Sequence, residues 1–231
     1  MEIEIWSDIA CPWCYIGKRR FESALVDFAH KDDTIVIWRS FQLDPTLPDH
    51  YEGTEGEYLA SRKGLAETQV NAMFDHVKGE AASEGLEYDF KNLVVANSFT
   101  AHRLLHLAKS HGLGTTTKEV LLSAHFEKGA DIGNIDTLVE IGTSIGLDVD
   151  EVRRVLEGDD FSADVEEDIS EARALGVSGV PFFVIDRKYG VSGAQPSEVF
   201  ASALDQAWTE AHPLTMVDTV SGDACGPDRC D

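Results

Sequence analysis

The stretch Ser7-Asp8-Ile9-Ala10-Cys11-Pro12-Trp13-Cys14 decides the fold, because it joins the pattern of a strand to the pattern of a helix. Before it, Glu2-Ile3-Glu4-Ile5-Trp6-Ser7 alternates polar and apolar residues, which is the period of a half-buried strand. After it, apolar side chains recur every three or four residues from Ile16 to Ala29, which predicts an amphipathic helix. A close pair of cysteines therefore stands where a strand passes into a helix.

The two ends of the chain complete an α/β pattern around this junction. A β-branched and aromatic run from Thr34 to Leu43 predicts a second strand, so the first part of the chain forms a β-α-β unit with a parallel crossover. A strand is also expected over 179–186, followed by a turn into a short strand at 191–193. A final helix is expected from Pro196 to Pro213.

Helical periodicity dominates the middle of the sequence. It predicts helical segments near 54–79, 96–111, 115–128, 134–145, 149–157 and 162–175. We therefore expect an all-helical insertion at 49–176, between the two parts of an α/β domain at 1–48 and 177–213. Residues 214–231 have no periodicity and are expected to form a flexible tail that carries two of the cysteines.

The charge of the chain argues against several partners. Its 231 residues include 19 basic and 42 acidic side chains, which gives a net charge of −23. Such a surface repels phosphate backbones and anionic headgroups, so we expect neither nucleic acid nor a membrane as a partner. No apolar run approaches the ~18 residues of a membrane span, and Met1 opens on charged residues instead of a signal peptide. A cytoplasmic location is therefore expected.

The four cysteines form two close pairs, Cys11 with Cys14 and Cys225 with Cys230. A Cys-x-x-Cys pair directly after a strand, at the head of a helix, is typical of a thiol–disulfide redox motif. The first cysteine of such a pair lies at the helix N-terminus, where unpaired N–H groups and the helix dipole favour a thiolate. We therefore expect Cys11 to be the attacking thiolate and Cys14 the resolving thiol, acting through a mixed disulfide.

Alternatives stay open for the cysteines. The two pairs could together supply four thiolates to zinc, but the strand-to-helix context and the longer spacing of the second pair disfavour such a site. We therefore expect no bound metal. Cys225 and Cys230 form either an auxiliary redox pair that exchanges with Cys11 and Cys14, or an exposed pair without a role in the mechanism.

The motifs carry a family resemblance. Cys11-Pro12-Trp13-Cys14-Tyr15-Ile16-Gly17-Lys18 after Ser7-Asp8, with Gly179-Val180-Pro181-Phe182-Phe183 much later, resembles the DsbA-like thioredoxin-fold proteins, and more narrowly the cytosolic FrnE-type dithiol–disulfide oxidoreductases. Residues 96–103 and 124–129 are similar to the helical insertion of that subfamily. The resemblance spans 2–212 and implies a thioredoxin fold, β-α-β … β-β-α, with a large all-helical insertion.

The resemblance also implies roles for two residues far from the cysteine pair. The proline that matches Pro181 is cis in this fold and lies beside the redox pair, which leaves the backbone of Val180 free to bind an extended peptide. Without that context, Pro181 is a proline at the entry of a strand. Trp13 replaces the histidine of the periplasmic prototype, so we expect a less acidic thiol and a less oxidising disulfide.

Three further side chains each have two interpretations. Trp13 provides apolar contact surface for a substrate or packs against the helical insertion. Asp8 accepts a proton when Cys14 attacks, or it caps the following turn. His102 and His106 have the spacing of a zinc motif, but Arg103 stands where that motif needs glutamate, so we expect packing histidines.

The sequence thus predicts a thiol–disulfide oxidoreductase or isomerase that acts on disulfide-containing proteins or small molecules. An external thiol reductant or oxidant would recycle it; no tightly bound cofactor is expected, and glutathione as a redox partner is left open. One rival is a glutathione-using transferase or isomerase of the kappa or 2-hydroxychromene-2-carboxylate isomerase type, which has serine at the position of Cys11. Another rival is a holdase-like or zinc-binding module. Apolar positions on the insertion leave a homodimer open.

Overall fold

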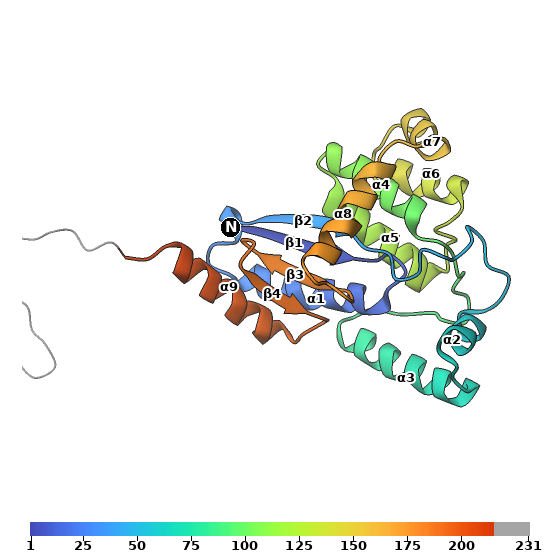
Figure 1. Cartoon of the computed structure of the whole chain (residues 1–231), viewed down its shortest axis with the longest axis horizontal. Helices are drawn as coiled ribbons and strands as arrows, with labels where there is room; N and C mark the ends of the chain where they lie inside the picture. The colour runs from blue at the N-terminus through green and yellow to red at the C-terminus, as the bar shows by residue number, and fades with distance from the viewer. Residues whose placement is uncertain (215–231) are drawn as a thin grey trace, which may run out of the picture.

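A four-stranded mixed sheet forms the centre of the fold (Figure 1). The computed structural model describes residues 1–214. In sheet order the strands are β2 (Ile35–Ser40), β1 (Glu2–Ser7), β3 (Phe182–Ile185) and β4 (Tyr189–Ser192). β1 pairs parallel with β2 and antiparallel with β3, and β3 pairs antiparallel with β4. With α1 (Pro12–Asp27) between β1 and β2, and α9 (Ser197–Ala211) after β4, the predicted β-α-β … β-β-α order is confirmed.

The two faces of the sheet pack against different helices because side chains alternate along each strand. On one face, Ile3 and Ile5 belong to the core that α1 and α9 close, where the Phe183 and Phe200 rings lie 4.6 Å apart. On the other face, Trp6 packs with residues of the α8 region and donates its indole N–H to the Asp168 carbonyl oxygen at 2.8 Å. The sheet is therefore covered on both sides.

Seven helices lie between β2 and β3. They are α2 (Glu55–Lys63), α3 (Glu67–Ser83), α4 (Phe99–Ser110), α5 (Gly114–Lys128), α6 (Ile135–Ser144), α7 (Val149–Glu157) and α8 (Ser162–Ala174); a single 3-10 turn, η1 (Lys31–Asp33), precedes β2. Figure 1 shows α4 to α8 on one side of the end of the sheet and α2 with α3 on the other. α4 is almost wholly buried, and its apolar residues join the same core as Ile3 and Ile5. One apolar core therefore runs from the sheet into the helical insertion.

Several element boundaries differ from the predicted ones. The strand predicted over 179–186 is β3 at Phe182–Ile185, because residues 179–181 form the loop before it and Pro181 lacks an N–H for the sheet. α1 starts at Pro12, one turn before the predicted start at 16, because Cys11 caps the helix and proline suits its first position. The single helix predicted over 54–79 is two helices, since α2 ends at Gly64 in a left-handed conformation with φ 64°. β4 begins two residues before the predicted strand, because Asp186 and Arg187 form the turn with positive φ.

Within residues 1–214, no helix combines the length and the apolar character that crossing a membrane requires. Cys225 and Cys230 of the predicted tail lie outside the described residues.

Candidate active site

The two cysteines lie where β1 ends and α1 begins. Cys11 is the N-cap residue of α1, Pro12 takes the first helical position, and the N–H of Cys14 donates to the carbonyl oxygen of Cys11 at 3.0 Å. Both thiols are free and buried, with 4% of Cys11 and 1% of Cys14 exposed. The Tyr88 hydroxyl donates to the carbonyl oxygen of Pro12 at 2.7 Å and so ties this turn to the helical insertion. The free N–H groups of the first helical turn therefore surround the cysteine pair.

The loop before β3 lies against the pair. The Val180–Pro181 peptide bond is cis, and the Cys11 Sγ lies 3.6 Å from the carbonyl oxygen of Val180. Gly17 of α1 permits this approach, because a Cβ at Gly17 would stand 2.8 Å from the Cγ of Pro181. The structure thus brings Pro181 and Val180 next to the redox pair from the far end of the chain.

The Cys11 thiol donates to the carbonyl oxygen of Val180, and each thiol of the pair also shifts the pKa of the other. Burial raises the pKa of the Cys14 thiol, but the hydrogen bond from Cys11 and the charge of Lys118 outweigh it, so the pKa is lowered overall. The hydrogen bond to Cys14, followed by burial, raises the pKa of Cys11 well above its usual value, because a second ionisation would place two thiolates side by side. The first ionisation of the pair therefore has a lowered pKa and the second ionisation has a raised pKa.

Lys118 attracts the Cys14 thiolate more strongly than the Cys11 thiolate. The helix N-terminus acts on Cys11, whereas the buried ammonium acts mainly on the second sulfur. The assignment of Cys11 as the attacking thiolate stays a prediction.

Lys118 was not among the residues predicted from the sequence. Its side chain, on α5, is fully buried; the ammonium donates to the carbonyl oxygen of Ser7 at 3.4 Å and lies 5.7 Å from the centre of a Trp38 ring. Burial lowers the pKa of Lys118 to about 8, although Cys14 and Asp8 oppose the shift. A sequence signal exists, because Lys118 shares its buried helix face with Leu121 and Leu122. A lysine in such a register is a candidate for a charge with a buried partner.

The buried carboxylate of Asp8 contacts three groups. Its carboxylate accepts from the N–H groups of Leu43 at 2.8 Å and Ala10 at 3.2 Å, and lies 3.3 Å from the Nε2 of His102. Burial raises the pKa of Asp8, but the hydrogen bonds and the His102 contact outweigh it and hold the pKa below its usual value. A carboxylate of lowered pKa is a weak proton acceptor, so these contacts favour the turn interpretation of Asp8.

The histidine pair on α4 faces two different partners. His102 contacts Asp8, whereas the Nε2 of His106 lies 3.0 Å from Asp168 and 3.1 Å from the hydroxyl of Ser40. These are the contacts of packing histidines. Among residues 1–214, no three His, Cys, Asp or Glu side chains are grouped as a metal site would need. The four-thiolate zinc hypothesis involves Cys225 and Cys230 and so lies outside the described residues.

A cavity of ≈ 370 Å³ opens beside Cys11, between the redox turn and the two helices α2 and α3. Apolar side chains make up much of its wall, among them Leu47, Leu59, Met73, Phe74, Val77 and Phe90. Trp13 lines the cavity and also contacts α3, where its ring lies 5.7 Å from the ring of His76. Its position thus combines the two predicted interpretations, contact surface and packing. Glu55 also lines the cavity, and burial raises its pKa to about 7.

The chain is similar to proteins of known family and structure. Residues 2–205 match the DSBA-like thioredoxin domain. The probable DsbA oxidoreductase SCO1869 from Streptomyces coelicolor is 44% identical, with a TM-score of 0.88 over 100% of this chain and 98% of that one. The uncharacterized protein YwbO of Bacillus subtilis (strain 168) is 26% identical over 207 residues, 88% of this chain and 96% of that one. The cytosolic disulfide reductase DsbM from Pseudomonas aeruginosa, solved with GSH, has a TM-score of 0.63 and is 16% identical. The match covers 90% of this chain and 99% of the DsbM chain.

Replacing Lys118 by methionine should raise the pKa of the more acidic thiol, because the buried ammonium that stabilises its thiolate is lost. The alkylation profile should therefore move to higher pH, and alkylation near neutral pH should slow severalfold. The measurement is the pH dependence of alkylation of the reduced protein in a Cys225→Ser/Cys230→Ser background, so that only Cys11 and Cys14 are followed. Methionine is apolar and similar in length, so the fold should persist. Lys128→Met, on the exposed end of the same helix, is the matched control. Equal alkylation profiles in the two variants would rule out this role of Lys118.

Proposed function

The chain belongs to the DSBA-like thioredoxin domain family, and from this membership we propose that it exchanges disulfides through Cys11 and Cys14. The observation that carries the proposal is the pair of free thiols at a helix N-terminus, with a cis-proline loop 3.6 Å from the first sulfur. A thiolate so placed is suited to attack a disulfide. The two thiols then take the roles of attacking and resolving groups.

The position of the cavity supports Cys11 as the attacking group. Cys11 lines the cavity, whereas Cys14 is more deeply buried. Cys14 also interacts more strongly with the charge of Lys118 than Cys11 does. Exchange begins from the state in which Cys14 carries the proton and Cys11 is the thiolate. Because the two thiols titrate as a coupled pair, this state is in equilibrium with the state in which Cys11 carries the proton.

The exchange proceeds in two displacements. The Cys11 thiolate attacks one sulfur of the substrate disulfide, forms a mixed disulfide and releases the first substrate thiolate. Cys14 then loses its proton and attacks the Cys11 sulfur, which releases the second substrate thiolate and leaves a Cys11–Cys14 disulfide. Two electrons pass to the substrate, and two protons complete the two product thiols. Lys118 favours the second step, because its charge lowers the pKa of Cys14.

Substrate and partners follow from the same surroundings. We infer that the backbone of Val180 binds an extended substrate segment and that Trp13 provides apolar contact, for protein and small-molecule disulfides alike. An external thiol recycles the pair, and glutathione is a candidate because DsbM, which shares the fold, was solved with GSH. A cytoplasmic location and a homodimer stay predictions. The glutathione-using transferase or isomerase stays a rival, to be judged by the experiment below.

Exchange should stop at the mixed disulfide when Cys14 is replaced by serine, because the resolving thiol is lost. In a Cys225→Ser/Cys230→Ser background, which removes the other two thiols, incubation of reduced Cys14→Ser with bis(2-hydroxyethyl) disulfide should add one substrate arm to Cys11, as read by intact mass. Cys11→Ser in the same background should give little adduct, since Cys14 is the more deeply buried thiol and does not line the cavity. Equal adducts on both variants would contradict the assignment. Glutathione conjugation that survives in Cys14→Ser would favour the rival function.

We propose an auxiliary redox role for Cys225 and Cys230, which lie outside the described residues. The double variant Cys225→Ser/Cys230→Ser should then turn over more slowly with a disulfide substrate, while the reduction potential of Cys11–Cys14 stays unchanged. Turnover equal to that of the wild type would remove the auxiliary role without affecting the roles of Cys11 and Cys14.

A further inference from the structure

The cavity beside Cys11 contains a carboxylate without a partner. Glu55 lies in the first turn of α2, half-buried, and makes no hydrogen bond or ion pair with any residue from 1 to 214. The other two carboxylates that line the cavity are engaged. Asp8 is held by two N–H groups and His102. Asp44 accepts from the Tyr58 hydroxyl at 2.9 Å and lies 3.1 Å from the Nε of Arg62.

The rest of the wall is suited to a group that carries positive charge. Aromatic rings of Trp13, Tyr58, Phe74 and Phe90 line the same cavity as Glu55. Aromatic rings and a carboxylate in one cavity can together bind an ammonium group, through cation–π attraction and an ion pair. Among the carboxylates of this wall, Glu55 is the one left available to a ligand; a ring nitrogen of His125, buried in the same wall, is also without a partner among the described residues.

The net charge of the chain also favours a cationic ligand. The whole chain carries a net charge of −23, which raises the local concentration of cationic ligands and lowers that of anionic ones. Arg62 and Lys63 also line the cavity, but Arg62 is paired with Asp44 and Lys63 is exposed to solvent. Neither cation therefore offsets Glu55 inside the cavity.

We propose that this cavity selects small disulfides whose apolar arm ends in an amino group, with the disulfide at Cys11 and the ammonium at Glu55. The proposal rests on the proposed function and names its substrate class. A volume of ≈ 370 Å³ is that of a site for a small molecule, so the ligand is a low-molecular-weight aminoalkyl disulfide. Reduction of one such disulfide by the Cys11/Cys14 dithiol gives two aminoalkyl thiols and the protein disulfide.

The test compares three kinds of symmetrical disulfide with matched arm lengths. Bis(aminoalkyl), bis(hydroxyalkyl) and bis(carboxyalkyl) disulfides, in a series of increasing arm length, are mixed with the reduced full-length protein, and the rate of oxidation of Cys11 and Cys14 is followed. Each rate is divided by the rate of the same disulfide with dithiothreitol, which removes intrinsic reactivity. We expect the best amino disulfide to exceed its hydroxyl counterpart about tenfold, since a partly desolvated ion pair and the aromatic rings both favour the ammonium.

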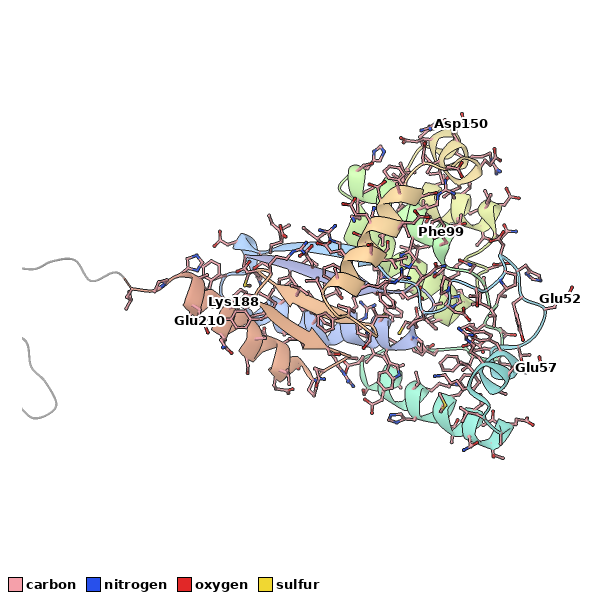
Figure 2. All side chains as sticks on the ribbon, in the orientation of Figure 1. Glu52, Glu57, Phe99, Asp150, Lys188 and Glu210 are labelled. Atoms are coloured by element: carbon pink, nitrogen blue, oxygen red, sulfur yellow. The ribbon has the colours of Figure 1, made fainter. Side chains whose placement is uncertain are left out.

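Glu55→Gln should abolish this preference and leave the rate with the hydroxyl disulfide unchanged, which also shows that the variant is folded. Glu52→Gln is the matched control, because it removes the same charge three residues away. Glu52 is exposed and lies at the outer edge of the molecule in Figure 2, away from the cavity lining. An amino preference that persists in Glu55→Gln, or that is absent from the wild type at every arm length, overturns the proposal while the proposed function stands. Absence of exchange with all three kinds of disulfide overturns the proposed function as well.

Discussion

The interaction of two buried thiols with each other and with a buried ammonium is the contact on which the chemistry of this molecule depends. Cys11 and Cys14 shift each other's pKa, and the positive charge of Lys118 favours the thiolate of Cys14 in a buried site. A lone buried thiolate would be costly, and so would a lone buried ammonium. Each offsets the other, which explains how Lys118 remains fully buried with one carbonyl oxygen as its hydrogen-bond partner in the described chain.

The helical insertion therefore supplies side chains to the candidate active site. The sheet, α1 and the cis-proline loop bring together the sulfurs and the backbone of Val180. Lys118 comes from α5, and α2 and α3 contribute to the walls of the cavity beside Cys11. Residues of α3 and α5 pack with Tyr15 and Ile16 of α1 in one buried apolar cluster, which holds these two helices in place beside the redox pair. The same short motif can thus serve different substrates as the insertion varies.

Much of the fold was predictable because its signals are local. Alternation in β1, helical periodicity in α1 and the spacing of the cysteines each lie within a short window of sequence. The break at Gly64 was missed because an isolated glycine inside a helical pattern does not by itself end a helix. The relation of Lys118 and Glu55 to Cys11 could not be predicted, since it depends on contacts between helices distant in the sequence. The effect of Lys118 on Cys14 could not be predicted for the same reason, because this charge comes from α5.

The most direct test of the coupling between the two thiols is to count the thiolates in the reduced protein as a function of pH. Ultraviolet absorbance of the thiolate can count them, with the unfolded protein as reference and with Cys225→Ser/Cys230→Ser to remove the other two thiols. The account predicts that one thiolate appears below the ordinary thiol pKa of about 8.5 and that the second appears well above it. Two thiolates that appear together near the ordinary value would contradict it.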